Sequence, residues 1–395
     1  MLSGKNIVLG VTGSIAAYKM ANLASQLKKL NADVTVLMTE NAAHFIHPIT
    51  FETLTGNKCL TDTFDRNFQY QVEHVALAKK ADAVLVAPAS ANVIGKLAGG
   101  IADDMLTTTV MACTCRKILA PAMNTQMYRN PILQDNLDKL RRFGYEVIPP
   151  DTGLLACGDV GIGKMPSENV LLQYLLRECA FEKDMAGRRV LVTAGPTMEK
   201  IDPVRFISNH SSGRMGYALA RNCMLRGAQV TLVTGRTSLE PPLFVKVIHV
   251  VSAQEMYEAV IRNFEDQDIV IKAAAVADYR PMHPAHEKVK KKEDHLQIEL
   301  ERTEDILKTL GRLRKKQFLC GFSMETENLI GNSQKKLEEK QLDMVVANSL
   351  TTAGAGFGTD TNVVTILTPD GMKGLEMMTK DEAAGIIVDE ILARI

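Results

Sequence analysis

Residues 187–216 have the sequence GRRVLVTAGPTMEKIDPVRFISNHSSGRMG, and the organisation of the chain follows from this stretch. Its first part, RRVLVTAG, is a continuous apolar run ending at glycine and proline, which is typical of a strand covered on both faces of a sheet. A polar loop follows, and Ser211, Ser212 and Gly213 precede a segment that predicts a helix. This order predicts that a second α/β unit begins here, after a first one has been completed.

The loop between this strand and this helix is longer than packing requires. Serine and glycine at a helix start leave backbone N–H groups free to bind an anion, with the helix dipole behind them. Asn209 lies just before that point. We therefore favour a binding role for the loop over an ordinary strand–loop–helix with a serine cap.

Composition sets the broad class of the protein. The 395 residues are enough for two or more domains. The 46 basic and 46 acidic side chains balance, so nothing indicates a nucleic acid or an anionic membrane as partner. No apolar run reaches membrane-spanning length, and the N-terminus enters a strand without an export signal. Seven cysteines lack zinc-site spacing, which favours reduced thiols in a cytoplasmic protein.

The first half begins with a predicted strand at residues 5–12, which contains Gly10 near its end. Gly13 and Ser14 follow at the start of a predicted helix. Small residues in this place can cradle a phosphate, although the full GxGxxG fingerprint is missing. The next strand ends at Met38 and Thr39, where an NAD site requires an acidic residue for the ribose. The pattern favours a different nucleotide, such as flavin mononucleotide (FMN).

Two further predicted strands also end in small and polar residues. Ser90 and Asn92 follow one of them, and Asn124 follows the other. Ligands of open α/β sheets bind at the carboxyl ends of strands, so these loops should face the same site as Gly13.

The segment 153–165, GLLACGDVGIGKM, contains four glycines and predicts a mobile loop, or flap. Cys157 in this flap should be exposed and flanked by Asp159 and Lys164. Such a thiol is a candidate for proton transfer or nucleophilic chemistry, although a lone cysteine is usually structural. His74 precedes an amphipathic segment. The sequence supports a surface role and a functional role for it equally.

In the second half, the predicted strand DIVIKAAAVADYR ends near Asp278. A basic loop follows with Lys288, Lys290, Lys291 and Lys292, which is either a solvated face or a lid over a triphosphate. Thr303 is the expected N-cap of the next helix. The sequence thus predicts two α/β domains, at 1–180 and 188–395, joined by a linker at 181–187.

The chain resembles, over essentially its whole length, the bifunctional family of coenzyme A biosynthesis proteins. In that family a phosphopantothenoylcysteine decarboxylase is fused to a phosphopantothenate–cysteine ligase. The resemblance rests on several separated motifs: GVTGSIAAYK, His74-Val, PASANVIGK, PAMNTQM, ACGDVGIGKM, the TAGPT…SSGRMG stretch, AAAVADYR and EKVKK. Tyr128 stands where the family often has tryptophan.

For the first half, the resemblance implies a doubly wound, flavodoxin-like domain that binds FMN. Its phosphate would contact Gly13, Ser14, Ser90 and Asn92, and Thr39 would lie near the flavin ring. Three further residues would be catalytic. His74 would assist oxidative decarboxylation, Asn124 would hold the substrate carboxylate, and Cys157 would donate the proton of the final reduction.

For the second half, the resemblance implies a Rossmann-like ligase that uses CTP and Mg²⁺ to join 4′-phosphopantothenate to cysteine through an acyl-cytidylate. Lys288 would serve formation of the acyl-cytidylate, and Asn209 would act on it during attack by cysteine. The residues implied for CTP are Asp278, Thr303, Glu304, Asp305, Ile306, Phe322, Lys336 and Lys340. No metal ligand is implied.

The resemblance also implies an assembly in which FMN lies between subunits of a decarboxylase trimer and the ligase domains pair as dimers, giving a homododecamer. Three alternatives remain at this stage. They are a two-domain NAD-dependent dehydrogenase, a non-enzymatic flavoprotein regulator, and a chain in which one half is inactive. The missing acidic residue after Met38 opposes the first, and the lack of an acidic tail opposes the second.

Overall fold

The computed structural model describes residues 1–395 except 65–71, 291–295, 326 and 350–358. The chain divides into two compact units, Met1–Glu182 and Lys183–Ile395. Both are α/β units built on a largely parallel sheet, which confirms the predicted fold class. In the described residues, no helix combines the length and the apolar character needed to cross a bilayer.

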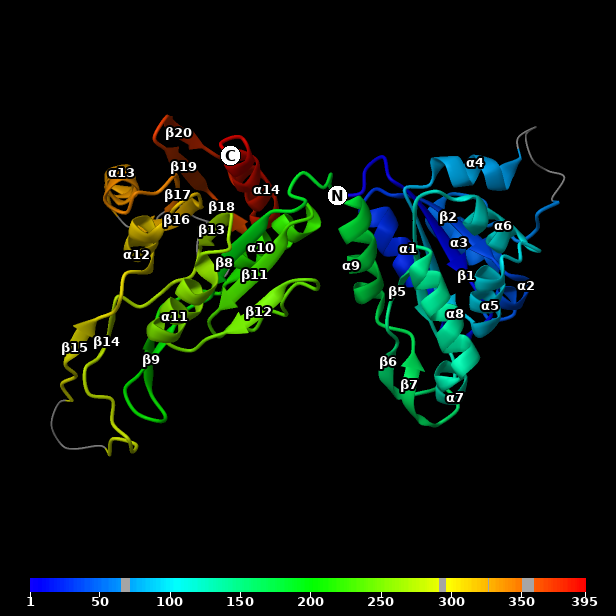
Figure 1. The fold of residues 1–395 in the computed structure, drawn as a ribbon, viewed down its shortest axis with the longest axis horizontal. Helices are drawn as coiled ribbons and strands as arrows, with labels where there is room; N and C mark the ends of the chain where they lie inside the picture. The colour runs from blue at the N-terminus through cyan, green and yellow to red at the C-terminus, as the bar shows by residue number, and fades with distance from the viewer. Residues whose placement is uncertain (65–71, 291–295, 326, 350–358) are drawn as a thin grey trace. The chain divides into compact units, whose positions relative to one another are not determined.

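The N-terminal unit has a five-stranded parallel sheet in the order β2-β1-β3-β4-β5 (Figure 1). This is the flavodoxin-like order, in which the chain reverses its direction of winding between β1 and β3. The strands are β1 (Asn6–Val11), β2 (Asp33–Met38), β3 (Ala83–Ala89), β4 (Arg116–Pro121) and β5 (Glu146–Val147). Every residue of β3 is buried, as a central strand covered by helices requires.

Helices cover this sheet. Four of them share one hydrophobic core with the strands: α4 (Glu73–Lys80), α5 (Ala91–Gly99), α6 (Met105–Ala112) and α8 (Pro131–Arg142). The helices α1 (Lys19–Lys29) and α9 (Glu168–Cys179) pack against each other and against β2 and β3. The remaining short helices are η1 (Ile15–Tyr18), α2 (Glu40–Ala43), α3 (Pro48–Thr55) and α7 (Thr125–Arg129).

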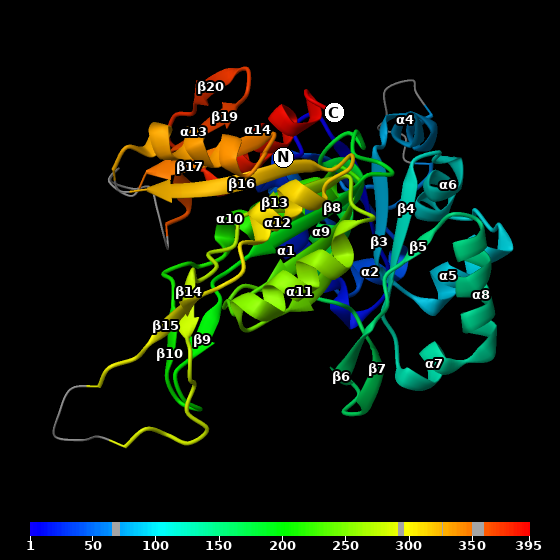
Figure 2. The ribbon, with the colours of Figure 1, turned by 60° about the vertical axis from the view of Figure 1, so that its left-hand side comes forward.

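The glycine-rich flap is regular, which corrects the prediction of a loop without secondary structure. It forms an antiparallel hairpin of β6 (Asp151–Leu154) and β7 (Val160–Lys164), and Cys157 lies exposed in its turn. The hairpin depends on glycine at position 163. Gly163 has a φ of +133°, and a Cβ there would lie 2.3 Å from the Met123 carbonyl oxygen, too close for any other residue. Figures 1 and 2 show the hairpin next to α7 at one end of the unit.

The C-terminal unit has an eight-stranded sheet in the order β12-β11-β8-β13-β16-β17-β19-β20. Its six parallel strands follow the Rossmann order 3-2-1-4-5-6, with the reversal between β8 and β13. These strands are β8 (Arg189–Ala194), β11 (Gln229–Thr234), β12 (Lys246–His249), β13 (Ile269–Lys272), β16 (Phe318–Glu325) and β17 (Met344–Ser349). The antiparallel strands β19 (Val364–Thr368) and β20 (Gly371–Gly374) complete one edge.

In the described part of this unit the helices are α10 (Arg214–Leu225), α11 (Ala253–Phe264), α12 (Ile306–Leu313), α13 (Leu329–Glu339) and α14 (Lys380–Leu392). The N-cap of α12 is Asp305, whose side chain accepts from the Lys308 N–H, so the expectation of a Thr303 cap is wrong. Thr303 instead donates from its hydroxyl to the Ala277 carbonyl at 2.6 Å. The Asp305 carboxylate, two residues later, accepts from the free Lys308 N–H at the helix start.

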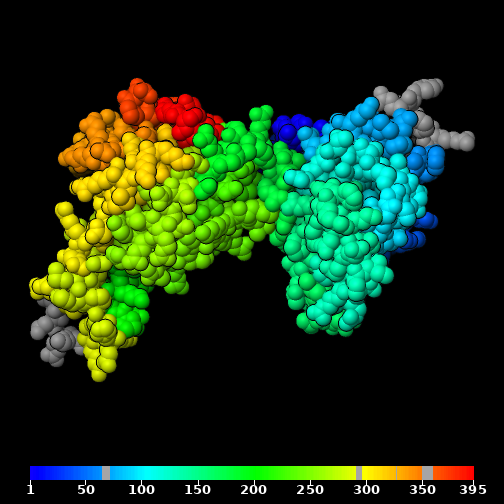
Figure 3. Space-filling model, in the orientation of Figure 1, coloured from blue at the N-terminus to red at the C-terminus, as the bar shows by residue number. Residues whose placement is uncertain are grey.

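Short strands form an arm outside the main sheet: β9 (Met198–Lys200) with β10 (Phe206–Ser208), and β14 (Tyr279–Pro281) with β15 (Leu300–Arg302). Figure 3 shows this arm protruding from the body of the C-terminal unit. The pair β18 (Thr361–Asn362) and β21 (Met378–Thr379) lies before α14.

Candidate functional site

Thr12 holds together the loops that follow β1 and β3, at the reversal of the sheet. Its buried hydroxyl donates to the Pro88 carbonyl at 2.6 Å and accepts from the Ser90 N–H at 2.9 Å. Ser14 caps η1, and Ser90 caps α5. The two loops predicted to share a site therefore lie together, with their helix N-termini beside one another.

Thr39 and Gly13 are the two residues of this region whose surroundings are unusual, and the Thr39 hydroxyl indicates a bound group. The Thr39 hydroxyl is buried and has no hydrogen-bond partner among the described residues. A Cβ at Gly13 would lie 2.7 Å from Asn41 Cβ, so only glycine lets the backbone approach this closely. A buried hydroxyl without a partner is costly, and a ligand's polar atom would satisfy it.

The flap carries the second cluster of this unit. Asn124 Nδ2 lies 3.2 Å from Asp159 Oδ2 and 3.5 Å from Cys157 Sγ. The thiol in turn donates to Asp159 at 3.4 Å. The Met123 N–H donates to the Gly163 carbonyl at 3.0 Å, which fixes the hairpin to the loop after β4. The structure thus brings together Asn124 and Cys157, 33 residues apart in sequence.

His74 is not part of this cluster. It is half-buried on α4, and among the described residues it has no hydrogen bond to Asn124, Cys157 or Asp159. Figures 1 and 2 show α4 and the hairpin at opposite ends of the N-terminal unit. One chain therefore does not assemble all of the predicted decarboxylase residues.

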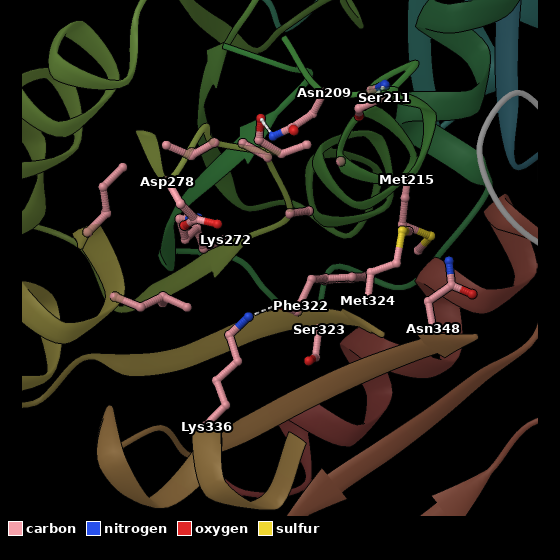
Figure 4. Close-up of a pocket in the computed structure, with 18 of the residues that line it drawn as sticks. Asn209, Ser211, Met215, Lys272, Asp278, Phe322, Ser323, Met324, Lys336 and Asn348 are labelled. Carbon is pink, nitrogen blue, oxygen red and sulfur yellow. Dashed lines mark hydrogen bonds between the residues drawn. The ribbon is translucent and has the colours of Figure 1, made fainter. Parts of the chain in front are cut away.

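The C-terminal unit has a cavity of about 870 Å³ at the reversal between β8 and β13 (Figure 4). This volume suits a small-molecule ligand. Nine of the ten residues predicted for this half line it: Asn209, Asp278, Thr303, Glu304, Asp305, Ile306, Phe322, Lys336 and Lys340.

Asn209 lies at one edge of the cavity and donates to the Ala275 carbonyl at 3.2 Å. It is exposed and lies before Gly213, which has a φ of +77° and is the N-cap of α10. Among the described residues no side chain caps this helix, and its first residues, 214–216, line the cavity beside Ser211. Figure 4 shows Asn209 and Lys336 on opposite sides of the opening.

Lysines concentrate positive charge in the cavity. Lys340 Nζ lies 2.8 Å from Asp305 Oδ2, and Lys336 Nζ donates to the Phe322 carbonyl at 2.6 Å. Burial would raise the pKa of Asp305, but hydrogen bonds from Lys340 and from the Lys308 N–H hold it below its usual value. Burial, followed by the charge of Lys340, lowers the pKa of Lys336. The site is therefore suited to an anion.

Lys288 is the predicted ligase residue that does not line this cavity. It is exposed on the arm, and the neighbouring Lys291 and Lys292 lie outside the described residues. The Val289 N–H donates to Asp202 Oδ2 at 3.1 Å, and Asp202 also accepts from the N–H groups of Val204 and Arg205 at 2.8 Å. The buried Asp202 thus fixes the backbone next to Lys288.

Sequence reasoning missed Lys272 and Asn348, which also line the cavity. Lys272 ends the otherwise buried strand β13, and a charge in that position was a usable signal. Asn348 is buried on β17 with an Oδ1 that has no partner among the described residues. Nothing in its local sequence distinguishes it from a core asparagine.

Two family profiles match the chain: "Flavoprotein" over residues 1–179, and "DNA/pantothenate metabolism flavoprotein C-terminal domain" over residues 185–395. Among curated relatives, the coenzyme A biosynthesis bifunctional protein CoaBC of Bacillus subtilis is 46% identical, with 100% of this chain and 98% of the relative covered. The protein of that name from Escherichia coli is 39% identical, with 100% and 98% covered.

Solved structures are also similar to parts of the chain. The C-terminal domain of a coenzyme A biosynthesis bifunctional protein CoaBC is 48% identical, with a TM-score of 0.47, and the match covers 54% of this chain and 97% of that one. A PPC decarboxylase mutant complexed with pantothenoylaminoethenethiol is 32% identical, with a TM-score of 0.40, and the match covers 43% of this chain and 96% of that one.

Proposed function

The chain belongs to the family of coenzyme A biosynthesis bifunctional proteins, and on that premise we propose how its two sites divide the work. It is an enzyme with a ligase and a decarboxylase activity in coenzyme A biosynthesis. We assign the decarboxylase to residues 1–180 and the ligase to residues 188–395, with a linker at 181–187. Ligation comes first, because its product, phosphopantothenoylcysteine, is the substrate of the decarboxylase and is converted to 4′-phosphopantetheine.

The N-terminal unit is a flavoprotein, and FMN would bind at the loops that Thr12 joins. Gly13 and Ser14 from one loop, and Ser90 and Asn92 from the other, would hold the phosphate at two adjacent helix N-termini. The partnerless hydroxyl of Thr39 would bond to the ring system. When bound, FMN supplies the oxidation of the substrate's cysteine side that makes its carboxyl group leave, and later returns the electrons.

The chain's own residues position the substrate and move protons. Asn124, on the loop after β4, binds the carboxylate that is to leave. Cys157, in contact with Asn124 at 3.5 Å, donates the proton needed when the ene-thiol is reduced. His74 assists the oxidative decarboxylation. The flap hairpin closes over the substrate and excludes water.

The separation of His74 from the flap supports an oligomeric decarboxylase. Because α4 and the hairpin lie at opposite ends of one unit, His74 would meet the flap of another copy. A trimer with FMN between its subunits meets this requirement, and pairing of the ligase units then gives a dodecamer of four trimers. The cysteines of the described residues form no disulfide, which favours a cytoplasmic location.

The cavity of the C-terminal unit would bind CTP. Lys336 and Lys340 neutralise the triphosphate, Asp278 and the residues from Thr303 to Ile306 line the nucleoside end, and Phe322 borders it. Attack of the 4′-phosphopantothenate carboxylate on the α-phosphate gives an acyl-cytidylate and releases pyrophosphate. The cysteine amine then displaces CMP. Asn209 holds the reacting group during this second step, and Lys288 serves the first by closure of the arm.

Mg²⁺ would offset the triphosphate charge, and it is commonly held through substrate phosphates with one or two carboxylates. Among the described residues, no cluster of three histidine, cysteine or acidic side chains could hold a metal ion. We assign it no protein ligand.

One observation carries the ligase proposal. A cavity at the sheet's reversal point has Asn209 and a free helix N-terminus on one side and a pair of lysines on the other. A dehydrogenase is not favoured, because no acidic residue ends β2. The test is direct: purified protein should show flavin absorbance and should release pyrophosphate from CTP only with 4′-phosphopantothenate present. A colourless protein, or one that releases no pyrophosphate from CTP in the presence of 4′-phosphopantothenate, contradicts the proposal.

A further inference from the structure

Lys272 occupies a central place in the ligase cavity. It is the last residue of β13, between Thr193 of β8 and Gly321 of β16 in the parallel ladder. The three preceding residues of β13 are buried, whereas Lys272 lies at the strand's carboxyl end and lines the cavity. Figure 4 shows it with Asp278 on one wall, and Lys336 approaches from helix α13.

The charges around Lys272 are unbalanced. Lys340 is paired with Asp305, and Lys336 donates to the Phe322 carbonyl. Among the described residues, Lys272 Nζ has no hydrogen-bond or ion-pair partner. The charged groups that act on Lys272 are Lys336, Lys340, Asp305 and Asp278. Within this group three lysines face two carboxylates, and one positive charge is left for a ligand.

Burial, followed by the charges of Lys336 and Lys340, lowers the pKa of Lys272 to about 8, against a smaller opposing effect of Asp305 and Asp278. Near neutral pH a fraction of this side chain is uncharged in the empty site. An anion placed beside it would favour the ammonium form, because opposite charges within a few ångströms raise the pKa of a lysine.

We propose that Lys272 binds the phosphate chain of the nucleotide together with Lys336 and Lys340, and takes up a proton as the nucleotide binds. The inference rests on the proposed binding of CTP in this cavity. Lys272 then has two effects: it adds a charge-assisted hydrogen bond to the phosphates, and it couples nucleotide affinity to pH. A triphosphate concentrates its negative charges in one short chain, whereas 4′-phosphopantothenate carries its carboxylate and its phosphate at opposite ends of the molecule. The triphosphate therefore matches three clustered lysines better.

The first test is calorimetric titration of the full-length protein with CTP and Mg²⁺ at pH 7. Lys272→Met should weaken CTP binding about tenfold or more, and Lys272→Arg, which keeps the charge, should weaken it much less. Lys335→Met is the matched control, since Lys335 is an exposed neighbour of Lys336 that pairs with Glu339. Titration with 4′-phosphopantothenate alone should be unchanged in Lys272→Met.

Equal CTP affinity in Lys272→Met and the wild type would overturn the inference, as would a selective loss of 4′-phosphopantothenate binding. Failure of the wild type to bind CTP would instead contradict the proposed function. A circular dichroism melt shows whether Lys272→Met has folded, and the Arg variant keeps the test open if it has not.

The second test measures the proton and needs no loss of binding. Titrations at pH 8.5 in two buffers of different protonation enthalpy give the number of protons taken up per CTP. At this pH the triphosphate itself is fully ionised. The wild type should take up more than about half a proton per CTP bound. Lys272→Arg should take up at least about half a proton fewer than the wild type, because arginine remains charged. Equal proton uptake in the two proteins would contradict the inference.

Discussion

Asn124 Nδ2 lies 3.5 Å from Cys157 Sγ, a contact between the loop after β4 and the turn of the flap hairpin. Asp159 completes the group by accepting from both side chains. The contact places the residue that would bind the departing carboxylate beside the thiol that would deliver a proton to the same part of the substrate. Loop and flap thus bring the two proposed catalytic residues into contact.

Replacing Cys157 by serine should separate the two stages of decarboxylation. Carbon dioxide should still be released, because the thiol is needed only for the later proton donation. The yield of reduced 4′-phosphopantetheine should fall by about a hundredfold or more, since a general acid contributes that much. Carbon dioxide and thiol product are measured in the same reaction. Cys115→Ser, at a half-buried cysteine outside the flap, is the control, and normal product yield from Cys157→Ser would refute the role.

Asn209→Asp should slow ligation at its second step. The substitution removes the side-chain N–H donor of Asn209, which bonds to the Ala275 carbonyl. It puts a negative charge there that would repel the phosphate of the acyl-cytidylate. We expect acyl-cytidylate to accumulate and ligation to slow by about a hundredfold. Mass spectrometry of quenched reactions detects the intermediate. Asn328→Asp changes an exposed asparagine of the same unit and should have no effect; an unaltered ligation rate in Asn209→Asp would remove Asn209 from the mechanism.

Gly163→Ala should release the flap. A Cβ at this position would lie 2.3 Å from the Met123 carbonyl oxygen, and the φ of +133° is itself strained for alanine. Decarboxylation should fall at least tenfold, while ligation in the same protein serves as an internal control. Gly95→Ala, inside α5 with no atom closer than 3.9 Å, should leave both activities intact. Decarboxylation at the wild-type rate would show that the flap's attachment is unimportant.

Asp202→Asn should loosen the arm that carries Lys288. An amide nitrogen in place of Oδ2 cannot accept from the Val289 N–H, so hydrogen exchange in residues 283–290 should accelerate and ligation should slow roughly tenfold. Asp266→Asn, at an exposed carboxylate, is the matched control. Unchanged exchange in this segment would contradict the anchoring role.

The contribution of Asp202 to stability should depend on pH. Burial would raise the pKa of its carboxyl, but the N–H groups of Val204, Arg205 and Val289 hold it below the usual value of 3.8. Because the pKa of this carboxyl is lower in the folded state, it stabilises the fold at pH values above its pKa in the unfolded chain. The stabilisation is lost as the pH falls through its pKa in the folded state. The urea midpoint of Asp202→Asn should therefore lie below the wild type at pH 7, and the two should converge below about pH 4. A constant gap would contradict this assignment.

The fold was predictable from sequence because apolar strands buried on both faces, such as RVLVTA, are unambiguous and recur between amphipathic helices. Cap positions and the flap were less accessible. Asp305 rather than Thr303 caps α12, because the chain turns into the helix two residues later than the threonine indicates. The flap's glycines indicated a loop, yet its pairing is fixed by contacts with Met123 that lie far away in sequence.

The ligase cavity was largely predictable, since strand-end loops meet at one edge of a parallel sheet. Lys272 was missed although a charge at the end of the otherwise buried strand β13 was a usable signal. Only the folded cavity shows that, among the described residues, it lacks a partner while Lys336 and Lys340 have theirs. The placement of Lys288 could not be predicted either, because the arm positions it through a backbone contact to Asp202. The tertiary structure was also needed to show that α4, which carries His74, lies away from the flap hairpin (Figures 1 and 2).

Two catalysts that act in series in one chain should both be visible in a single coupled reaction. Purified protein is incubated with 4′-phosphopantothenate, cysteine and Mg²⁺, with CTP or with ATP, while pyrophosphate and carbon dioxide are followed separately. We expect CTP to drive pyrophosphate release, and carbon dioxide to follow after a lag and to approach one equivalent per pyrophosphate. Carbon dioxide without pyrophosphate, or pyrophosphate that is never followed by carbon dioxide, would show that the two activities do not act in series.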